Sequence, residues 1–400
     1  MSIASISSVS PVGNEIEVTW SDGKKSKYHN IWLRDNCHCA ECYYSLTKQR
    51  LLNSATIDPE IRTKDVQLCK ETVGITWDDD SSHVSEFSPA WLRLHSYNPR
   101  LIPVADKLRG YDTVLERKLW QVEDIKDNLP HVDFEQVMSS SDETDGEEAV
   151  KDWSLKIWRH GFCLVDNVPV TPEATQSLCE KLNYIRPTHY GGFWDFTSDL
   201  AKADTAYTNF DISNHTDGTY WSNTPGLQLF HLLYHDGEGG TTSLVDAFKC
   251  AEILKEKFPE SFEVFCRVRV PAHSAGEEKV CIQPDLPQPV FKLDESGSLV
   301  QVRWNQSDRS TMDSWDDPSD VVKFYQAIRN WVSIITSKEN ELWHQMKPGQ
   351  ALIFDNWRVF HSRSEFSGKR RLCGAYLERD DFVSRLKLLC LGRETVLDSI

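Results

Sequence analysis

The sequence predicts a mainly β protein with helices, in which a jelly-roll barrel of the double-stranded β-helix type follows a small β-rich domain. The chain has 400 residues, more than one typical domain, and is long enough to bury a large core. Short segments of strand length recur along it, whereas helical patterns stand out over 246–257 and 318–336. Strand-rich sequence with a few long helices is typical of such a barrel supported by helices.

Residues 1–105 are expected to form the small domain. Glu15–Trp20 alternates polar and apolar residues, and Gly74–Trp77 is a second short β segment. A linker with a helical connection is expected over 106–150, because the polar stretch Ser139–Glu148 is typical of a solvated loop before a helix. The barrel then occupies 151–400.

Strand patterns dominate the barrel segment. They fall at Gly161–Val165, Leu227–His231, Ser243–Val245, Arg267–Val270, Ala351–Phe354 and a strand that carries Arg370. The pattern of Ser319–Ser337 places Phe324 and Trp331 near helical spacing, so this helix is expected to pack on the barrel.

The composition limits the class of partner and the compartment. A formal net charge of -17 argues against nucleic acid or an anionic membrane, because a surface that binds phosphates should be basic, and no apolar run reaches the length of a membrane span. The amino terminus has no Arg, and its first basic residue is Lys24. A cytoplasmic location is therefore expected, with a processed form in the mitochondrial matrix as the alternative. Eleven cysteines, an odd number, favour reduced thiols and a metal cluster over a disulfide framework.

His215, Asp217 and His361 form a candidate metal site. If residues 214–220 form a strand or a strand end, the i, i+2 spacing puts His215 and Asp217 on one face. Ala351–Phe354 predicts a buried strand whose continuation delivers His361. Two imidazoles and one carboxylate on one face of a metal leave three positions open, the arrangement with which non-haem Fe(II) binds an oxoacid and O2 together. An oxygenase is therefore the leading hypothesis.

Arg370 is expected to face the same cavity as the metal. A strand with period-2 alternation places Arg370, Leu372, Gly374 and Tyr376 on one face. An arginine there suits a bidentate clamp on the distal carboxylate of 2-oxoglutarate. A His-x-Asp triplet also arises by chance, but the downstream His and Arg in this order, with Gly239–Thr242 between the halves of the triad, favour a metal site.

Four segments resemble the Fe(II)/2-oxoglutarate oxygenases of the taurine dioxygenase superfamily. They are residues 214–217, 239–246, 354–358 and 372–376. More narrowly, they are similar to the carnitine-biosynthesis branch, which contains γ-butyrobetaine dioxygenase and trimethyllysine dioxygenase. Ile31–Cys37 resembles a hallmark of that branch, so the resemblance covers nearly the whole chain.

The resemblance implies a specific enzymatic reaction. His215, Asp217 and His361 would hold Fe(II), and Arg370 and Thr242 would clamp 2-oxoglutarate, with ascorbate as reductant. The favoured activity is hydroxylation of N6,N6,N6-trimethyl-L-lysine at C3, the first step of carnitine biosynthesis, in which 2-oxoglutarate is converted to succinate and CO2. The partners are then this trimethylammonium amino acid, 2-oxoglutarate and O2, and the family also implies a homodimer.

Cys37, Cys39 and Cys42 place three thiols within six residues, a pattern with few structural uses besides a soft metal such as Zn2+. A closed tetrahedral site needs a fourth ligand. The resemblance to the family's zinc site favours His83, whereas His38 is nearer in sequence and is not excluded by spacing. Four protein ligands leave no open position, so the zinc would be structural. The alternative is a set of reduced cysteines in a tight core.

The substrate cage is predicted from the resemblance. Aromatic faces attract a quaternary ammonium through the ring quadrupole. In the resembled branch, the positions that match Tyr190, Trp194, Tyr207 and Tyr376 build such a cage. Without the resemblance, ordinary core aromatics are the simpler interpretation, since 11% of the chain is aromatic.

Asp204 and Asn305 are the candidate residues for the polar end of the substrate. Butyrobetaine enzymes resemble one another in having a neutral asparagine at the position of Asp204, and a carboxylate there would attract an α-ammonium but repel a lone carboxylate. This favours trimethyllysine over γ-butyrobetaine, although a solvated loop Asp is the ordinary alternative. Asn305 matches an amide that the branch uses at the polar end, and Arg303 or Arg309 is a candidate carboxylate partner.

Three other functions stay open. A γ-butyrobetaine dioxygenase would form L-carnitine and would have no special use for Asp204. An interaction scaffold would combine the amino-terminal zinc module with a silent barrel, although the intact ligands and Arg370 argue against it. A hydrolytic zinc enzyme would use the same three ligands without O2 or 2-oxoglutarate.

Overall fold

The computed structural model describes residues 5–69, 72–79, 83–102, 115–139, 145–197 and 209–398. The chain divides into two compact units. The first consists of Met1–Thr113 and Leu391–Ile400, and the second is Val114–Cys390. Asp204 and Tyr207 lie outside the described residues. The sequence-based boundaries at residues 105 and 150 stay predictions.

The first unit contains two three-stranded antiparallel sheets. They consist of β1 (Ile6–Val12), β2 (Glu15–Trp20) and β3 (Lys25–His29), and of β6 (Thr63–Leu68), β7 (Val73–Trp77) and β8 (Val84–Phe87). Trp20 and Trp77 are buried in one hydrophobic cluster. Each indole nitrogen donates to a buried serine, Trp20 to Ser26 at 2.9 Å and Trp77 to Ser85 at 2.8 Å, so neither polar atom is buried without a partner.

Shorter elements complete this unit. They are α1 (Asn30–Asp35), β4 (Tyr43–Tyr44), β5 (Gln49–Arg50), a 3-10 turn η1 (Ser54–Thr56), α2 (Pro89–Leu94) and α12 (Arg393–Leu397). Ser88 caps α2, since its side chain accepts from the backbone N–H of Trp91, and Pro89 fills the first turn.

The second unit is built on a six-stranded and a four-stranded sheet. In spatial order the larger sheet contains β11 (Phe193–Thr197), β22 (Arg370–Leu377), β13 (Leu227–His235), β20 (Gln350–Asp355), β10 (Phe162–Asp166) and β9 (His131–Asp133). The smaller contains β12 (Ile212–His215), β21 (Val359–Arg363), β14 (Thr242–Asp246) and β19 (Leu342–His344).

The two sheets pack face to face. Successive side chains of a strand point to opposite faces, and on one face of the larger sheet lie Leu164, Leu352 and Leu372. They share a buried cluster with Leu244 and Leu342 of the smaller sheet. Part of the interior between the sheets is therefore apolar, and His361 of β21 and Arg370 of β22 belong to the same two sheets.

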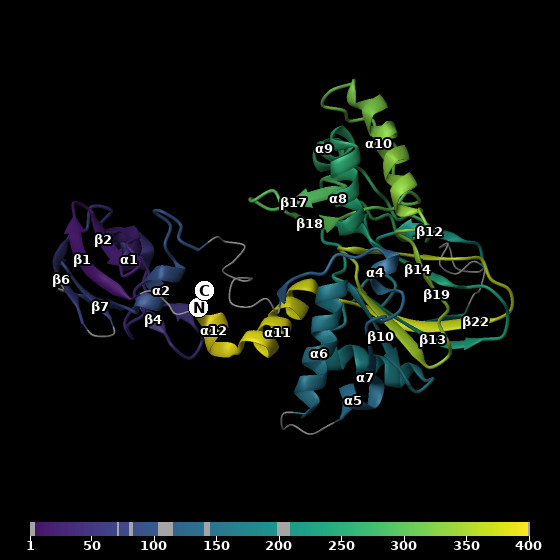
Figure 1. Ribbon diagram of the computed structural model, residues 1–400, viewed down its shortest axis with the longest axis horizontal. Helices are drawn as coiled ribbons and strands as arrows, with labels where there is room; N and C mark the ends of the chain where they lie inside the picture. The colour runs from purple at the N-terminus through teal and green to yellow at the C-terminus, as the bar shows by residue number, and fades with distance from the viewer. Residues whose placement is uncertain are drawn as a thin grey trace. The chain divides into compact units, whose positions relative to one another are not determined.

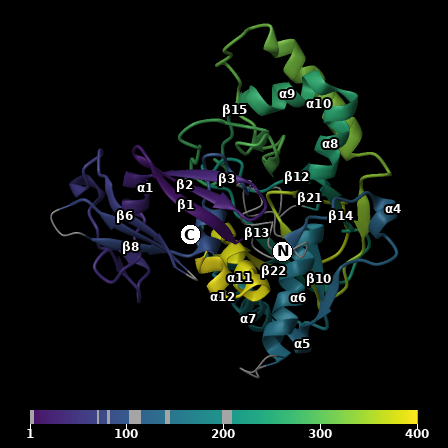
Figure 2. The same ribbon diagram turned by 60° about the vertical axis from the view of Figure 1, so that its left-hand side comes forward.

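Helices cover the outer faces. One buried cluster joins outward residues of the larger sheet, such as Ile353, to helices that include Trp153 and Leu178. Another joins Val245 and Phe360 of the smaller sheet to its own helices. Figure 1 shows these two helical groups on different sides of the sheets, and Figure 2 shows α6 beside β10. The first group is α5 (Phe134–Met138), α6 (Asp145–His160), α7 (Pro172–Leu182) and α11 (Arg379–Leu391); the second is α8 (Ala247–Lys257), α9 (Pro259–Arg267) and α10 (Asp320–Ile335).

The remaining elements of this unit are α4 (Val122–Ile125), β15 (Arg269–Val270), β16 (Gln288–Pro289), β17 (Phe291–Leu293) and β18 (Leu299–Val302). No helix among the described residues is long and apolar enough to cross a membrane.

A buried ion pair fixes the turn between β20 and β21. Arg358 and Asp246 are both completely buried, and the Arg358 Nη2 to Asp246 Oδ2 distance is 2.7 Å. The guanidinium also donates to the backbone carbonyls of Lys118, Trp158 and Arg159, and so its burial is matched by hydrogen bonds. Because Arg358 precedes β21 directly, this network positions the strand that carries His361.

Most predicted elements agree with the structure, and two differ. The helices expected over 246–257 and 318–336 are α8 and α10, and the strand of Arg370 is β22. The strand expected at Arg267–Val270 is wrong in its first half, because Arg267 is the last residue of α9 and only Arg269–Val270 pairs. His361 does not continue the strand Ala351–Phe354; the chain turns after β20, and His361 lies on β21 in the other sheet.

Candidate metal centre and substrate cavity

His215, Asp217 and His361 come together in the second unit. Each offers a ligand atom, and these atoms all lie within 4.8 Å of one another. The distance from Asp217 Oδ1 to His215 Nε2 is 3.1 Å, and to His361 Nε2 it is 3.9 Å. Two imidazoles and one carboxylate on this scale fit one metal ion and leave part of its coordination sphere open.

Two strands and one turn deliver these side chains. His215 is the last residue of β12 and pairs with His361 across the antiparallel β12–β21 ladder. Asp217 lies just beyond the strand, where the Asn356 side chain accepts from its backbone N–H at 2.8 Å and donates to its carbonyl at 3.0 Å. Asp217 lies outside the strands, and Asn356 of the β20–β21 turn therefore fixes its backbone position.

The charge states of His361 and Asp217 suit metal binding, whereas for His215 the contact with Asp217 outweighs burial and raises the pKa. Burial and the nearby His215 lower the pKa of His361 to about 3, against the pull of Asp217. Burial alone would raise the pKa of Asp217, but His361, His215 and the Tyr376 hydroxyl outweigh it and hold that pKa well below its usual range. A charged carboxylate beside a neutral imidazole is the protonation state in which these groups coordinate a metal.

The three side chains open into a cavity of about 330 Å³. Its wall combines the ligand group with aromatic rings, two arginines and a polar segment after β18. Lining residues include Tyr190, Trp194, Tyr220, Gln228, Thr242, Trp304, Asn305, Asp308, Arg363, Arg370 and Tyr376. The volume is in the range of small-molecule sites, and the mixture of apolar rings and few polar groups is typical of them.

Arg370 supplies a buried cation at one part of this wall. Its side chain is 5% exposed, and its Nε atom has no hydrogen-bond partner among the described residues. Burial and the neighbouring Arg363 lower its pKa to about 9, so the group is still charged at neutral pH. Thr242 of β14 lines the same cavity. A buried guanidinium with an unused donor is suited to an anionic ligand.

The Gly239–Gly240 turn makes room for Arg370. Both residues have positive φ, 81° and 65°, a conformation that favours glycine. A Cβ atom on Gly240 would lie 3.2 Å from Arg370 Nε, and one on Gly239 would lie 2.2 Å from the Glu365 carbonyl oxygen. The turn therefore needs glycine for both its backbone and its packing.

Three of the four predicted cage residues line the cavity. The rings of Trp194 and Tyr376 are 6.0 Å apart in an edge arrangement, and the hydroxyl of Tyr190 is 3.2 Å from that of Tyr220. Gly374 lies under Trp194, since a Cβ there would come within 2.7 Å of the indole ring. The fourth, Tyr207, is outside the described residues.

The predicted residues of the polar end are placed in part. Asn305 lines the cavity, and its Nδ2 atom donates to Asp308 Oδ2 at 2.9 Å. Arg303 is occupied by the backbone, because its guanidinium donates to the carbonyls of Thr219, Ser222 and Trp221. Arg309 contacts the side chain of Gln306. Asp204 is not among the described residues.

Several cavity residues were not anticipated from the sequence. Tyr220 follows the ligand segment by only three residues, and Asp308 follows Asn305 by three, so proximity to the predicted residues was an available signal. Gln228 lies inside the strand predicted at Leu227–His231, where a single amide among apolar residues marks an inward position. Its Oε1 atom is buried without a hydrogen-bond partner among the described residues.

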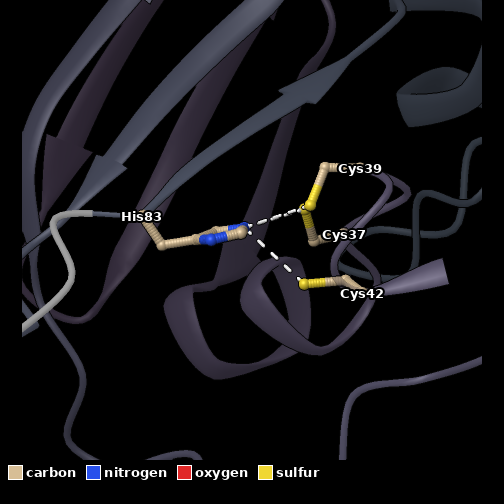
Figure 3. A group of neighbouring side chains, drawn as sticks. All are labelled: Cys37, Cys39, Cys42 and His83. Atoms are coloured by element: carbon tan, nitrogen blue, oxygen red, sulfur yellow. Dashed lines mark hydrogen bonds between the residues drawn. The ribbon is translucent and has the colours of Figure 1, made fainter.

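The second ligand group lies in the amino-terminal unit. His83 Nε2 is 3.3 Å from Cys37 Sγ and 3.6 Å from both Cys39 Sγ and Cys42 Sγ, as Figure 3 shows. His38 is not part of this group; its ring stacks on Tyr43 with centroids 4.5 Å apart. Three thiols and one imidazole match the donor set of a closed structural zinc site.

Two family models match the chain. Residues 122–376 match the family described as taurine catabolism dioxygenase TauD, TfdA, and residues 8–95 match the family described as gamma-butyrobetaine hydroxylase-like, N-terminal. The first match ends at Tyr376 and contains every described residue of the cavity named above.

Relatives match over nearly the whole chain. A trimethyllysine dioxygenase of Meyerozyma guilliermondii is 65% identical over 97% of this chain and 96% of its own length. The human protein named trimethyllysine dioxygenase, mitochondrial, is 36% identical over 91% of this chain and 83% of its own. Among solved structures, a taurine dioxygenase from Burkholderia xenovorans is 14% identical, with a TM-score of 0.47 over 65% of this chain and 89% of that one.

Proposed function

The chain belongs to the TauD, TfdA dioxygenase family and to its trimethyllysine dioxygenases, and from this premise we propose that the cavity binds Fe(II) and 2-oxoglutarate and hydroxylates N6,N6,N6-trimethyl-L-lysine at C3. The reaction makes the enzyme an oxidoreductase of carnitine biosynthesis. One observation carries the chemistry: the ligand group His215, Asp217 and His361 and the buried guanidinium of Arg370 face one cavity.

The donor set fits Fe(II) with open positions. One carboxylate and two imidazoles leave room for a bidentate oxoacid and O2, and an iron ion so held supplies the oxidising chemistry that couples decarboxylation to hydroxylation. The protein's own part is binding and orientation. Arg370, whose buried Nε atom has no hydrogen-bond partner in the described part of the chain, pairs with the distal carboxylate of 2-oxoglutarate, and Thr242 donates beside it.

The aromatic residues position the substrate. Tyr190, Trp194 and Tyr376 present ring faces and edges to the cavity, and such surfaces attract a trimethylammonium group that has no hydrogen to donate. Tyr207 completes the cage in this proposal, and Asp204 and Asn305 bind the polar end. Holding both ends of the substrate decides which carbon faces the metal, which is a positioning effect.

The test is an assay with both betaines. The chain is supplied with Fe(II), ascorbate and 2-oxoglutarate, and succinate formation and product mass are followed with trimethyllysine and γ-butyrobetaine in parallel. A hydroxylated trimethyllysine product is expected. Hydroxylation of γ-butyrobetaine alone would move the enzyme to carnitine formation, and no product from either would reject the proposal.

A ligand variant and a matched control sharpen this test. His361→Ala removes one ligand, so iron content and 2-oxoglutarate turnover should both be lost with either substrate. His235→Ala changes a half-buried histidine at the end of β13, outside the cavity lining, and should leave both unchanged. Full turnover by His361→Ala would contradict the assigned ligand group, and turnover without O2 would favour the hydrolytic alternative.

The finer features of the enzyme complete the proposal. The barrel is a double-stranded β-helix in which ascorbate keeps the iron reduced, and Cys37, Cys39, Cys42 and His83 hold a structural zinc ion. The chain works as a homodimer, for which sedimentation gives a direct test, and it acts in the cytoplasm. The word mitochondrial in the name of the human relative supports the matrix as the alternative compartment, and fractionation of cells that express the chain decides between the two.

A further inference from the structure

Gln228 places a buried amide in the wall of the cavity. It lies on β13, is 2% exposed and lines the cavity. Its neighbours Leu227 and Leu229 belong to the cluster on the outer face of the sheet, so strand alternation points the Gln228 side chain inward. Its Oε1 atom has no hydrogen-bond partner among the described residues. A buried amide oxygen without a partner lowers stability, so the fold retains an acceptor that its own hydrogen bonds do not use.

The register of the larger sheet sets Gln228 beside the metal-ligand group, because its directly opposite partners are Tyr376 of β22 and Phe354 of β20. Side chains paired in this way have Cβ atoms roughly 4.5–5.5 Å apart. The Tyr376 hydroxyl donates to Asp217 Oδ2 at 2.7 Å. The centroid of the Phe354 ring lies 4.6 Å from that of the His361 ring. Gln228 is therefore flanked by two side chains that each contact a different metal ligand.

An acceptor in this position suits a ligand that carries a hydrogen-bond donor. The 2-oxoglutarate dianion and O2 carry none, and the trimethylammonium group has no N–H. Besides water, the donor in the proposed reaction is the α-ammonium group of trimethyllysine. This group is attached to the carbon next to C3, so it lies near the metal whenever C3 does. A charge-assisted hydrogen bond is roughly twice as strong as a neutral one, which favours the ammonium over water as the partner of this oxygen.

Resting on the proposed function, we propose that Oε1 of Gln228 accepts a hydrogen bond from the α-ammonium group of trimethyllysine and makes the site selective for α-amino acids over simple betaines. The ammonium group has several N–H donors, so this contact leaves others for Asp204, the residue proposed for the polar end. γ-Butyrobetaine displaces water from the cavity but offers no donor. It would leave the amide oxygen buried without a partner, which lowers its affinity.

The experiment compares trimethyllysine with its des-amino analogue, 6-(trimethylammonio)hexanoate. The analogue has the same trimethylammonium group, chain and carboxylate and lacks the α-ammonium alone. The wild-type chain should prefer trimethyllysine in kcat/KM by on the order of 10- to 100-fold, the range for a hydrogen bond to a charged group. Gln228→Met keeps the length of the side chain and removes the amide. It should reduce this preference on the order of 10-fold, mainly because trimethyllysine becomes a poorer substrate.

Gln228→Glu separates the two ends of the amide. This variant keeps an acceptor at the same position and removes the N–H donors, so it should retain the preference for trimethyllysine. Gln301→Met is the matched control for burial, because Gln301 of β18 is 4% exposed and lies outside the cavity lining. The control should keep the wild-type preference.

Two measurements without turnover check folding and binding. Thermal melting of Gln228→Met without substrate should give a melting temperature equal to or above that of the wild type, since the variant removes a buried acceptor that has no partner in the described part of the chain. Calorimetry under argon, with Fe(II) and 2-oxoglutarate present, should show weaker binding of trimethyllysine to Gln228→Met and little change for the analogue.

Three results would overturn the inference. If Gln228→Met keeps the full preference, water satisfies the amide oxygen with both substrates. If it raises the KM for 2-oxoglutarate and lowers kcat/KM equally for both substrates, the amide serves the co-substrate. If Gln228→Glu loses the preference as Gln228→Met does, the N–H donors of the amide recognise the substrate instead of its oxygen. A wild-type chain that hydroxylates neither compound is a distinct result, because it rejects the proposed function itself.

Discussion

The Tyr376 hydroxyl donates a 2.7 Å hydrogen bond to Oδ2 of Asp217. Tyr376 lies on β22 and is 6% exposed, with Trp194 packed edge-on against its ring. One side chain thus contacts both the carboxylate of the metal-ligand group and the aromatic wall of the cavity. The proposed substrate site and the proposed metal site are therefore physically linked.

Tyr376→Phe separates these two contacts. The ring and its place beside Trp194 are kept, while the hydrogen bond to Asp217 is lost. Because partners of metal ligands typically contribute 10- to 100-fold to metal affinity, we expect iron binding to weaken by about 10-fold, measured by competition with a chelator. The KM for trimethyllysine at saturating iron should change little. Tyr325→Phe, at an exposed position of α10, is the control. A raised KM with unchanged iron affinity would mean that the hydroxyl serves the substrate.

Arg370 and Arg371 form a matched pair on one strand. Arg370 faces the cavity, whereas the Arg371 side chain is 43% exposed and pairs with Asp195. We expect Arg370→Met to raise the KM for 2-oxoglutarate on the order of 10- to 100-fold, because a charged hydrogen-bonded contact is lost. Arg371→Met removes a surface ion pair, which is worth about 1 kcal/mol or less, and should leave that KM unchanged. Equal effects of the two variants on steady-state kinetics would contradict the assigned role.

The residues of the site were predictable where strand alternation decides them. Arg370, Leu372 and Tyr376 share one face of β22 as their spacing predicts, and the β12 end brings His215 close to Asp217. His361 was expected on the continuation of the strand Ala351–Phe354, but it lies on β21 of the other sheet. Periodicity describes a strand but does not show that the chain turns after Asp355 and enters the other sheet.

The missed residues depend on tertiary contacts. Asp308 reaches the cavity because Trp304 and Thr216 are joined by two hydrogen bonds. These two residues are far apart in the sequence. At Arg267 the local pattern itself misled the prediction. Arg267–Val270 alternates like a strand, but the helix that begins at Pro259 continues through Arg267. Local pattern is a weak guide where tertiary packing of an amphipathic helix competes with it.

His83 and His38 differ in their position relative to the three thiols of the proposed zinc site. His83 lies with the three thiols, whereas His38 stacks on Tyr43. We expect His83→Ala to lose most of its bound zinc and to lower the melting temperature of the amino-terminal unit, because a metal held by the folded state alone stabilises it. His38→Ala should keep its zinc. Metal analysis of the purified variants together with thermal melting checks this, and zinc loss in His38→Ala alone would assign the fourth ligand to His38.

His231 makes the second unit sensitive to acid. The side chain is completely buried on β13, and its Nδ1 atom is 2.7 Å from Thr175 Oγ1. Burial lowers the pKa of His231 to about 4, from an ordinary value of 6.5. The unfolded chain therefore binds a proton at a higher pH than the folded chain does. The stability associated with neutral His231 is fully present above pH 6.5 and is lost as the pH falls from about 6.5 to about 4.

The loss should reach about 3 kcal/mol at pH 4, since each unit of pKa difference corresponds to about 1.4 kcal/mol. His231→Asn keeps a polar group near Thr175 and cannot take up this proton. Urea unfolding of both chains between pH 7.5 and pH 4 measures the difference, because the other titrating groups are common to both. The variant should be the less pH-sensitive of the two, and its stability should approach or pass that of the wild type on acidification. Parallel pH profiles for the two chains would show that His231 has the same pKa in the folded and the unfolded chain, which would contradict the lowering of its pKa by burial.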